Sequence, residues 1–249
     1  MSIAEKFEKI TDAVYEKGKK DEHAKFWDMV QKNGDRTYYY NGFIGTCYNF
    51  ENFYPKHDIN IVGSGQLFMY NWKNGMGQAD KDNIFESLKK RLEECNVTLN
   101  TGGATNLSNA FSYGTFTELP AIDLRGLTDT PSNIFSNNYT YLQTIEKIIV
   151  DENTPFTSSM FTNDTGLVSL TVEGTIAKNG FNVKDCKNLS SASIVSIIEA
   201  LSTETDGLTV TLSKTAVNNM TFPIVGNKGT YNSWTELEQT RTNWTISLV

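Results

Sequence analysis

The sequence predicts an α+β fold in which a short solenoid, with one strand per repeat, lies between an N-terminal helix and α/β caps. A six-residue frame, aliphatic-x-x-aliphatic-x-aliphatic, occurs three times, at residues 119–124, 145–150 and 167–172. Each frame follows a phenylalanine in a similar setting (Phe111, Phe135 and Phe161), and these phenylalanines are 24 and 26 residues apart. A period of this length is typical of stacked repeats, each of which contributes one short strand.

This pattern divides the chain into four segments. Residues 1–34 are predicted to be an N-terminal helix, and residues 35–95 an aromatic-rich cap. Residues 96–190 are predicted to form the solenoid, and residues 191–249 to close it with helix–strand units. A single repeat cannot bury its own apolar face, so both ends of the stack need such caps.

The N-terminal helix carries an apolar stripe at Ile3, Phe7, Ile10 and Val14, with the spacing of a coiled-coil seam. A second helical piece, residues 21–31, ends at Asn33-Gly34. The stripe either packs on its own domain or joins protomers into a homo-oligomer. Two heptads are marginal alone, so an oligomer would need support from elsewhere in the chain.

The aromatic-rich segment is irregular, with short strands expected at residues 59–62 and 66–70. Its rings either cover one end of the core or form a carbohydrate-stacking surface. A helix over residues 80–94 then leads to a strand at 96–99, which opens the stack.

Within the solenoid, the frame aliphatics point inward and the positions between and after them point outward in rows. One row contains Thr98, Asp123, Ile149 and Thr171, and its neighbour contains Asn100, Arg125, Asp151 and Glu173. The phenylalanines form a ladder on the opposite wall. We expect the outward rows to bind a partner, with these candidate residues: Asp123, Arg125, Ile149, Asp151, Thr171 and Glu173.

The C-terminal cap is predicted as two helix–strand pairs. The helices cover residues 193–201 and 232–240, and the strands cover residues 208–212 and 244–248, where apolar and polar residues alternate. These units close the open edge of the stack.

Charge and composition exclude several partners. The net charge is −7 and no basic run occurs, which argues against binding of nucleic acid or of a membrane surface. No signal peptide and no apolar run of membrane length is recognisable. We therefore expect the protein to stay in the cytoplasm where it is made, or to leave the cell by assembly or lysis.

No residue set predicts catalysis, a cofactor or a metal. Gly63-Ser64-Gly65 is expected to be a lone turn rather than a phosphate loop. A Cys47/His57 pair lacks an orienting group, and the three cysteines show no disulfide or zinc spacing. Asp123, Asp151 and Glu173 would lie about 5 Å apart on neighbouring strands and could share calcium, but Arg125 can neutralise them instead.

The frame resembles the core of leucine-rich repeats, and its phenylalanine-containing setting is closest to the BspA-like class of bacterial surface proteins. Further segments resemble the opening and closing sections of proteins encoded in prophages of Gram-positive gut bacteria, often near tail genes. They are residues 15–18, 26–28, 31–37, 55–58, 174–180, 199–203, 208–217 and 243–249. The resemblance implies a leucine-rich-repeat-like solenoid in a virion-associated or tail-associated protein.

Two functions are open at this point. The leading hypothesis is a non-enzymatic structural and recognition protein, part of a homo-oligomer or larger phage assembly, that attaches to a host-surface protein or glycan. The alternative is a carbohydrate-binding module or glycan-active protein that uses the aromatic-rich cap or the sheet face.

Overall fold

The computed structural model describes residues 30–33, 37–40, 59–64, 90, 93–94, 96, 98–112 and 117–249, and for the first three segments it describes the backbone alone. Both helices and strands are present, so the expected mixture of α and β elements is confirmed. Among the described residues, no helix has the length and apolar character needed to cross a membrane.

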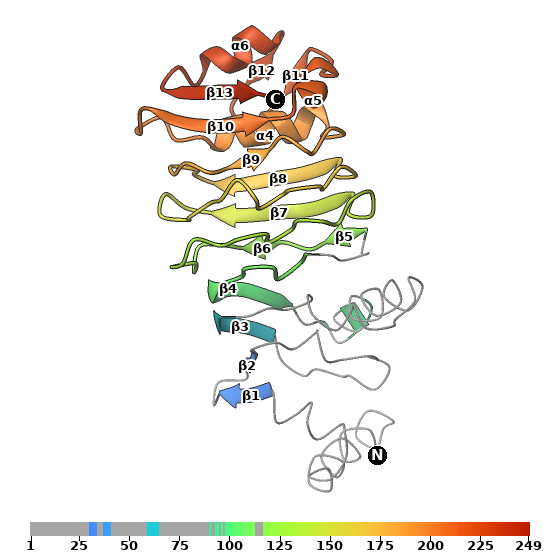
Figure 1. The fold of residues 1–249 in the computed structure, drawn as a ribbon, viewed down its shortest axis with the longest axis vertical. Coiled ribbons are helices and arrows are strands. Elements are labelled where there is room, and N and C mark those ends of the chain that lie inside the picture. The colour runs from blue at the N-terminus through green and yellow to red at the C-terminus, as the bar shows by residue number, and fades with distance from the viewer. Residues whose placement is uncertain are drawn as a thin grey trace, which may run out of the picture.

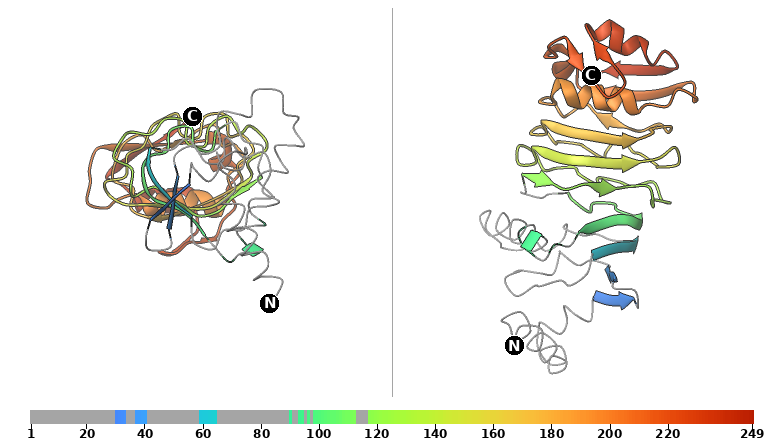
Figure 2. Two further views of the ribbon diagram at one scale, coloured as in Figure 1. Left: turned by 90° about the horizontal axis from the view of Figure 1, so that it is seen from below. Right: turned by 180° about the vertical axis from the view of Figure 1, so that it is seen from behind.

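Parallel strands, one above the other, form the middle of the molecule (Figure 1). β3 (Ile59–Ser64) pairs with β4 (Leu99–Asn106) in parallel. Next along the stack, β7 (Thr144–Val150) pairs in parallel with β5 (Glu118–Leu119), β6 (Ile122–Asp123) and β8 (Ser169–Gly174). Parallel neighbours require the chain to cross back after each strand, and the successive crossings lie over one another when seen along the long axis (Figure 2).

β4 and β6 are joined by a side chain. The Thr101 hydroxyl donates to the carbonyl oxygen of Asp123 over 2.9 Å and accepts from the Asp123 amide over 2.8 Å. The threonine thus replaces backbone pairing at this step of the stack, and its own side chain is buried. Pro120 separates β5 from β6 in the first frame because it cannot donate to a ladder, whereas β7 runs through the second frame without a break.

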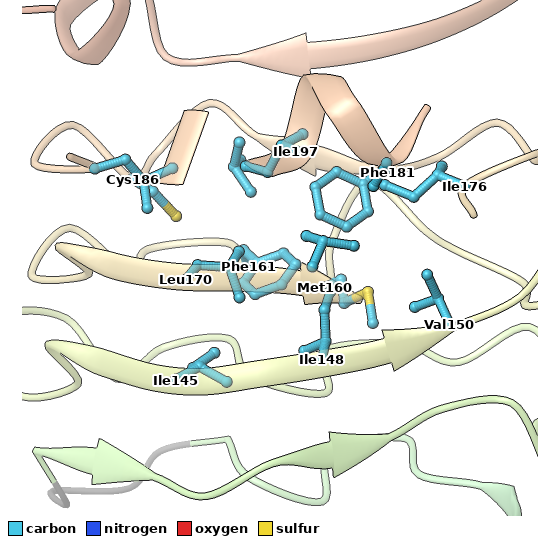
Figure 3. Close-up of a cluster of buried hydrophobic side chains, with 14 of the residues drawn as sticks. Ile145, Ile148, Val150, Met160, Phe161, Leu170, Ile176, Phe181, Cys186 and Ile197 are labelled. Carbon is cyan, nitrogen blue, oxygen red and sulfur yellow. The ribbon is translucent and has the colours of Figure 1, made fainter. Parts of the chain in front are cut away.

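The nine frame aliphatics are all buried, as predicted. They are Leu119, Ile122, Leu124, Ile145, Ile148, Val150, Leu167, Leu170 and Val172. Figure 3 shows Ile145 and Ile148 of β7 and Leu170 of β8 pointing into the interior between the strands and the returning chain. Burial of such a side chain is worth about 1.5–3 kcal/mol, so these positions supply much of the free energy that holds neighbouring strands together.

The predicted phenylalanine ladder is confirmed. The rings of Phe111 and Phe135 are stacked with centroids 5.7 Å apart, and those of Phe135 and Phe161 with centroids 5.1 Å apart. Phe181 adds a fourth, tilted ring at 5.8 Å from Phe161. Backbone hydrogen bonds run beside the ladder, from the Phe111 amide to Ile134 and from the Phe135 amide to Met160.

The C-terminal region contains α4 (Ser191–Ala200), β10 (Leu208–Leu212), α6 (Trp234–Gln239) and β13 (Trp244–Leu248), each close to its predicted bounds. β10 pairs in parallel with β13 and with β9 (Asn182–Val183). Four short elements have no counterpart in the sequence prediction: β9, α5 (Lys214–Asn218), and the antiparallel pair β11 (Ile224–Val225) and β12 (Thr230–Tyr231).

α4 replaces a strand on the next level of the stack. The Ser193 hydroxyl accepts from the Leu170 amide over 2.9 Å, and the Ser196 hydroxyl accepts from the Val172 amide over 2.8 Å. Two backbone donors of β8 are therefore satisfied by helix side chains instead of by another strand. The helix begins two residues earlier than predicted because the Ser190 side chain caps it by accepting from the Ser193 amide.

The N-terminal prediction is wrong where it can be compared. Residues 30 and 31 fall in the predicted helix, but Val30–Asn33 is strand β1, antiparallel to β2 (Thr37–Tyr40). Asn33-Gly34 can stop a helix but is also a strong hairpin signal, and the Thr-Tyr-Tyr-Tyr run of β2 favours a strand partner. β2 then pairs in parallel with β3.

Two further N-terminal details differ from prediction. The strand expected at residues 96–99 begins only at Leu99, because Asn96 lies in a turn with a φ of 52°. Gly63 and Ser64, expected in a turn, belong to β3. Ile3, Phe7, Ile10, Val14, most of the aromatic segment and the Cys47/His57 pair lie outside the described residues.

Candidate binding surface

Three of the six candidate residues form one row across neighbouring strands. Asp123 of β6 lies beside Ile149 of β7, and Ile149 lies beside Glu173 of β8. Residues alternate between the two faces of a strand, and the frame aliphatics that flank Asp123 and Ile149 and precede Glu173 are buried. The row therefore faces outward, with Glu173 exposed and both Asp123 and Ile149 half-buried.

Thr171 does not belong to this row, which corrects the prediction. Leu170 pairs with Ile145 and Val172 with Ile148, so β7 has two residues, Glu146 and Lys147, where β8 has only Thr171. Ile145, the first aliphatic of the second frame, thus pairs with Leu170, the second aliphatic of the third frame, so the two frames are offset by one aliphatic position. The shorter separation of these two frames, 22 residues against 26, was the signal that could have revealed the shift.

Arg125 is fixed against Asp123 at one end of the row. Its Nε donates to Asp123 Oδ1 over 3.0 Å and its Nη2 donates to Oδ2 over 2.8 Å, and the Arg125 amide also donates to Oδ1. Burial raises the pKa of the Asp123 carboxyl, but the hydrogen bonds and charge of Arg125 outweigh it and the pKa is lowered. The Asp123 side chain also lies over Gly102, where a Cβ atom would come within 2.6 Å of Oδ2.

A second ion pair crosses from β7 to β8. Lys147 Nζ donates to Glu173 Oε2 over 2.7 Å, and this hydrogen bond raises the pKa of Lys147. Arg125 and Lys147 bring two positive charges to a face that also carries Asp123 and Glu173. Each acidic end of the row is therefore paired with a cation, on either side of the half-buried Ile149.

Asp151 has a local role. Its Oδ1 accepts from the amides of Asn153 and Thr154, each over 2.9 Å, and from the Thr154 hydroxyl over 3.0 Å. The side chain closes the turn after β7. All three carboxylates of the possible calcium site, at Asp123, Asp151 and Glu173, thus bind donors of the protein, and the described residues contain no group of three or more metal-ligating side chains.

The structure also contains a buried carboxyl that sequence reasoning missed. Asp164 Oδ1 accepts from the Asn138 amide over 2.9 Å, while Oδ2 has no hydrogen-bond partner. Burial and, to a smaller extent, nearby Asp185 raise the pKa of Asp164 to about 8, against the lowering effect of the Asn138 hydrogen bond. The thiol of the adjacent, buried Cys186 likewise has a pKa raised by burial and by Asp164 and Asp185.

A polar network fastens the C-terminal cap. The Glu199 carboxylate accepts from the amides of Asn227 and Lys228, each over 2.8 Å, and from the Tyr231 hydroxyl over 2.9 Å. Burial and the Glu199 hydrogen bond raise the pKa of Tyr231 to about 12. Arg241, itself buried, donates to the carbonyl oxygens of residues 199, 201 and 240. Both buried charged side chains thus have hydrogen-bond partners within the cap.

Comparisons with known proteins add no assignment: no family model matches the sequence, and no curated protein or solved structure is similar to it. The resemblance to prophage-encoded repeat proteins stays a prediction, and the function must be argued from the chain itself.

Proposed function

We propose that this chain is a non-enzymatic, phage-associated structural and recognition protein whose middle region is a leucine-rich-repeat-like solenoid. The observation that carries the proposal is the outward row Asp123–Ile149–Glu173, built across three parallel strands and flanked by Arg125 and Lys147. The segments resembling prophage proteins support a tail or virion location.

The solenoid assignment is supported by features that recur at each level of the stack. Frame aliphatics fill the interior, and parallel strands succeed one another in sequence order from β6 to β8. Phenylalanines 24 and 26 residues apart stack ring on ring. A chain that coils with one strand per turn produces these three features together.

The chemistry of the row favours a protein partner on the host surface. An apolar centre at Ile149 surrounded by charges of both signs has the arrangement of a small interface, with a dry core and a polar rim. Rim charges contribute mainly to association rate and partner choice. The surface of a Gram-positive cell would present such a partner to a tail protein.

Attachment to cells tests this proposal. Labelled protein is titrated onto Gram-positive gut bacteria, and Arg125→Ser with Lys147→Ser is compared with the unchanged chain. We expect the double substitution to weaken attachment about tenfold, which corresponds to ~1.4 kcal/mol, with the larger effect at low salt. Lys214→Ser is the matched control, because Lys214 is exposed on α5 away from the row.

Two outcomes would contradict the proposal. One is attachment that is unchanged by the double substitution, which would remove the row from recognition. The other is an equal loss with Lys214→Ser, which would indicate a general charge effect rather than a contact at the row.

A further inference from the structure

Exposed large apolar side chains gather at one corner of the stack. The described residues have five of them, and three lie close together: Tyr139 at 50% exposure, Tyr141 at 40% and Val168 at 43%. The Gly166 amide donates to the Tyr139 carbonyl oxygen over 2.7 Å, and the Val168 amide donates to Gln143 over 2.8 Å. One turn therefore lies directly over the other. We name residues 139–143 together with 163–168 the Tyr139/Tyr141 corner.

Tyr139 has a backbone conformation that its side chain disfavours. Six non-glycine residues of the described chain have positive φ; five are asparagines, and the sixth is Tyr139 at 50°. Asparagine visits this region routinely, but a bulky residue places its Cβ against the following carbonyl oxygen. The tyrosine does not recover this cost by burial, since half of it is exposed.

Residues in strained backbone conformations cluster at functional sites. An asparagine at position 139 would make the same turn without the clash, as Asn137 and Asn163 do at φ of 63°. The exposed ring is thus kept at a cost to folding. The ring must contribute something that an asparagine cannot, and contact with a ligand is the direct explanation.

The corner is held rigidly from below. Asn138 is fully buried, and its Nδ2 donates to the carbonyl oxygens of Phe111 and Phe135 while its amide donates to Asp164. The Tyr141 amide donates to the Asn138 carbonyl oxygen over 3.0 Å. Both tyrosines therefore extend from a fixed turn, which reduces the entropy that a ligand must overcome.

The side chains around the tyrosines define the ligand class. Every exposed or half-buried side chain of residues 137–143 and 163–168 is uncharged: asparagine, threonine, tyrosine, glutamine and valine. Asn163 Nδ2 donates to Asn137 Oδ1 over 2.9 Å, which lines amide groups along the edge. The one charged group in contact is the Asp185 carboxylate, which already accepts from the Asn163 amide over 3.0 Å. No cationic side chain of these two segments would pair with an anionic ligand, whereas a sugar offers C–H faces for the rings and hydroxyls for the amides.

We propose that the Tyr139/Tyr141 corner binds a neutral glycan, with sugar rings stacked on Tyr139 and Tyr141 and hydroxyl groups held by Gln143 and Asn163. The proposal deepens the recognition function proposed above and rests on it. It adds a ligand class and a second contact surface, separate from the charged row.

Isothermal titration calorimetry with neutral hexasaccharides of glucose, mannose, galactose and N-acetylglucosamine tests the proposal on the full chain. We expect at least one to bind at millimolar concentration or below, and Tyr139→Asn to weaken it at least tenfold. The same substitution should leave the midpoint of thermal unfolding unchanged or raise it, because asparagine relieves the strained φ. A merely structural tyrosine would move both quantities in the same direction.

Val225→Asn is the matched control, since Val225 is 78% exposed on β11 in the C-terminal cap. It should bind as the unchanged chain does. Absence of binding by all four hexasaccharides overturns the proposal, and so does full affinity in Tyr139→Asn combined with Tyr141→Ser.

Cell attachment separates this proposal from the general one. If no hexasaccharide binds, while attachment to cells is abolished by protease treatment and needs Arg125 and Lys147, the glycan proposal fails and the recognition function stands. If the hexasaccharide binds through the tyrosines but the chain attaches to no cell, the glycan proposal stands and the recognition function fails.

Discussion

At the scale of single residues, equivalent positions of successive repeats carry different chemistry. Asn138 and Asp164 each lie three residues after a ladder phenylalanine, at Phe135 and Phe161. Asn138 uses its amide group to donate to two carbonyl oxygens, whereas Asp164 can only accept while it is ionised. The carboxyl is buried and its Oδ2 has no partner, and this desolvation is why the folded state favours the protonated acid.

This carboxyl predicts a pH dependence of stability. The pKa of Asp164 is about 8 in the folded chain, against an ordinary value of 3.8. Between these values the native state binds the extra proton, so stability should fall as pH rises from about 4 to about 8, by up to ~1.4 kcal/mol per pH unit. Asp164→Asn should remove this slope and raise the free energy of unfolding at pH 8.

Urea denaturation at about pH 5, 6.5 and 8 measures the effect, because these values span the range between the unfolded and folded pKa. Asp206→Asn is the control, because Asp206 is exposed and should keep the slope of the unchanged chain. An Asp164→Asn variant whose stability falls with pH as steeply as before would show that the carboxyl is ionised in the fold. Cys186 and Asp185, the titratable neighbours, are unchanged in this comparison.

At the scale of elements, the sequence predicted the features that depend on period and burial. β10 and β13 match their predicted bounds because apolar and polar residues alternate without interruption in Leu208–Leu212 and Trp244–Leu248. The pattern of the frame alone did not give the register of β8, since Leu167 and Leu170 fit its first position equally well; the shorter spacing between the frames was its one indication. Tertiary pairing with β7 decided between them.

The contact between α4 and β8 could not be predicted from the sequence either. Serines in a helix ordinarily indicate caps or solvent exposure, but Ser193 and Ser196 complete the hydrogen bonds of a strand 23 and 24 residues earlier. No periodic pattern signals this. The same is true of Glu199, which accepts from the amides of Asn227 and Lys228, and of Arg241, which donates to carbonyl oxygens at the end of α4.

These serines allow a test of the helix-for-strand replacement. Ser193→Ala with Ser196→Ala leaves the amides of Leu170 and Val172 without acceptors, at about 1–3 kcal/mol for each buried donor. We expect the free energy of unfolding to fall by about 2–6 kcal/mol in chemical denaturation, and the β8 amides to exchange faster with deuterium. Ser191→Ala, which removes only an exposed acceptor for the Thr221 amide, should cost less than about 1 kcal/mol. Equal costs for the two variants would argue against the replacement.

At the scale of the whole molecule, the predicted segments differ in how far the structure tests them. The mixture of helices and strands, the buried frames and the C-terminal helix–strand pairs agree with the sequence because local pattern and burial coincide there. At the N-terminal end, β1 is the outer strand of the order β1-β2-β3-β4 in the described residues, where the sequence predicts the end of a helix. An edge strand at that end matters for assembly, because unpaired strands are potential contacts between chains.

The predicted oligomer can be tested with the stripe of Ile3, Phe7, Ile10 and Val14, which lies outside the described residues. If the stripe joins protomers, Phe7→Glu with Ile10→Glu places charges in the seam, and light scattering should show monomers at micromolar concentration where the unchanged chain is oligomeric. Glu8→Lys is the control, because position 8 is outside the stripe. A deletion of residues 1–29 spares β1 and should behave like the double substitution. If that deletion leaves the oligomer intact, the junction belongs to β1 or another surface, and a monomeric unchanged chain would contradict the assembly proposal altogether.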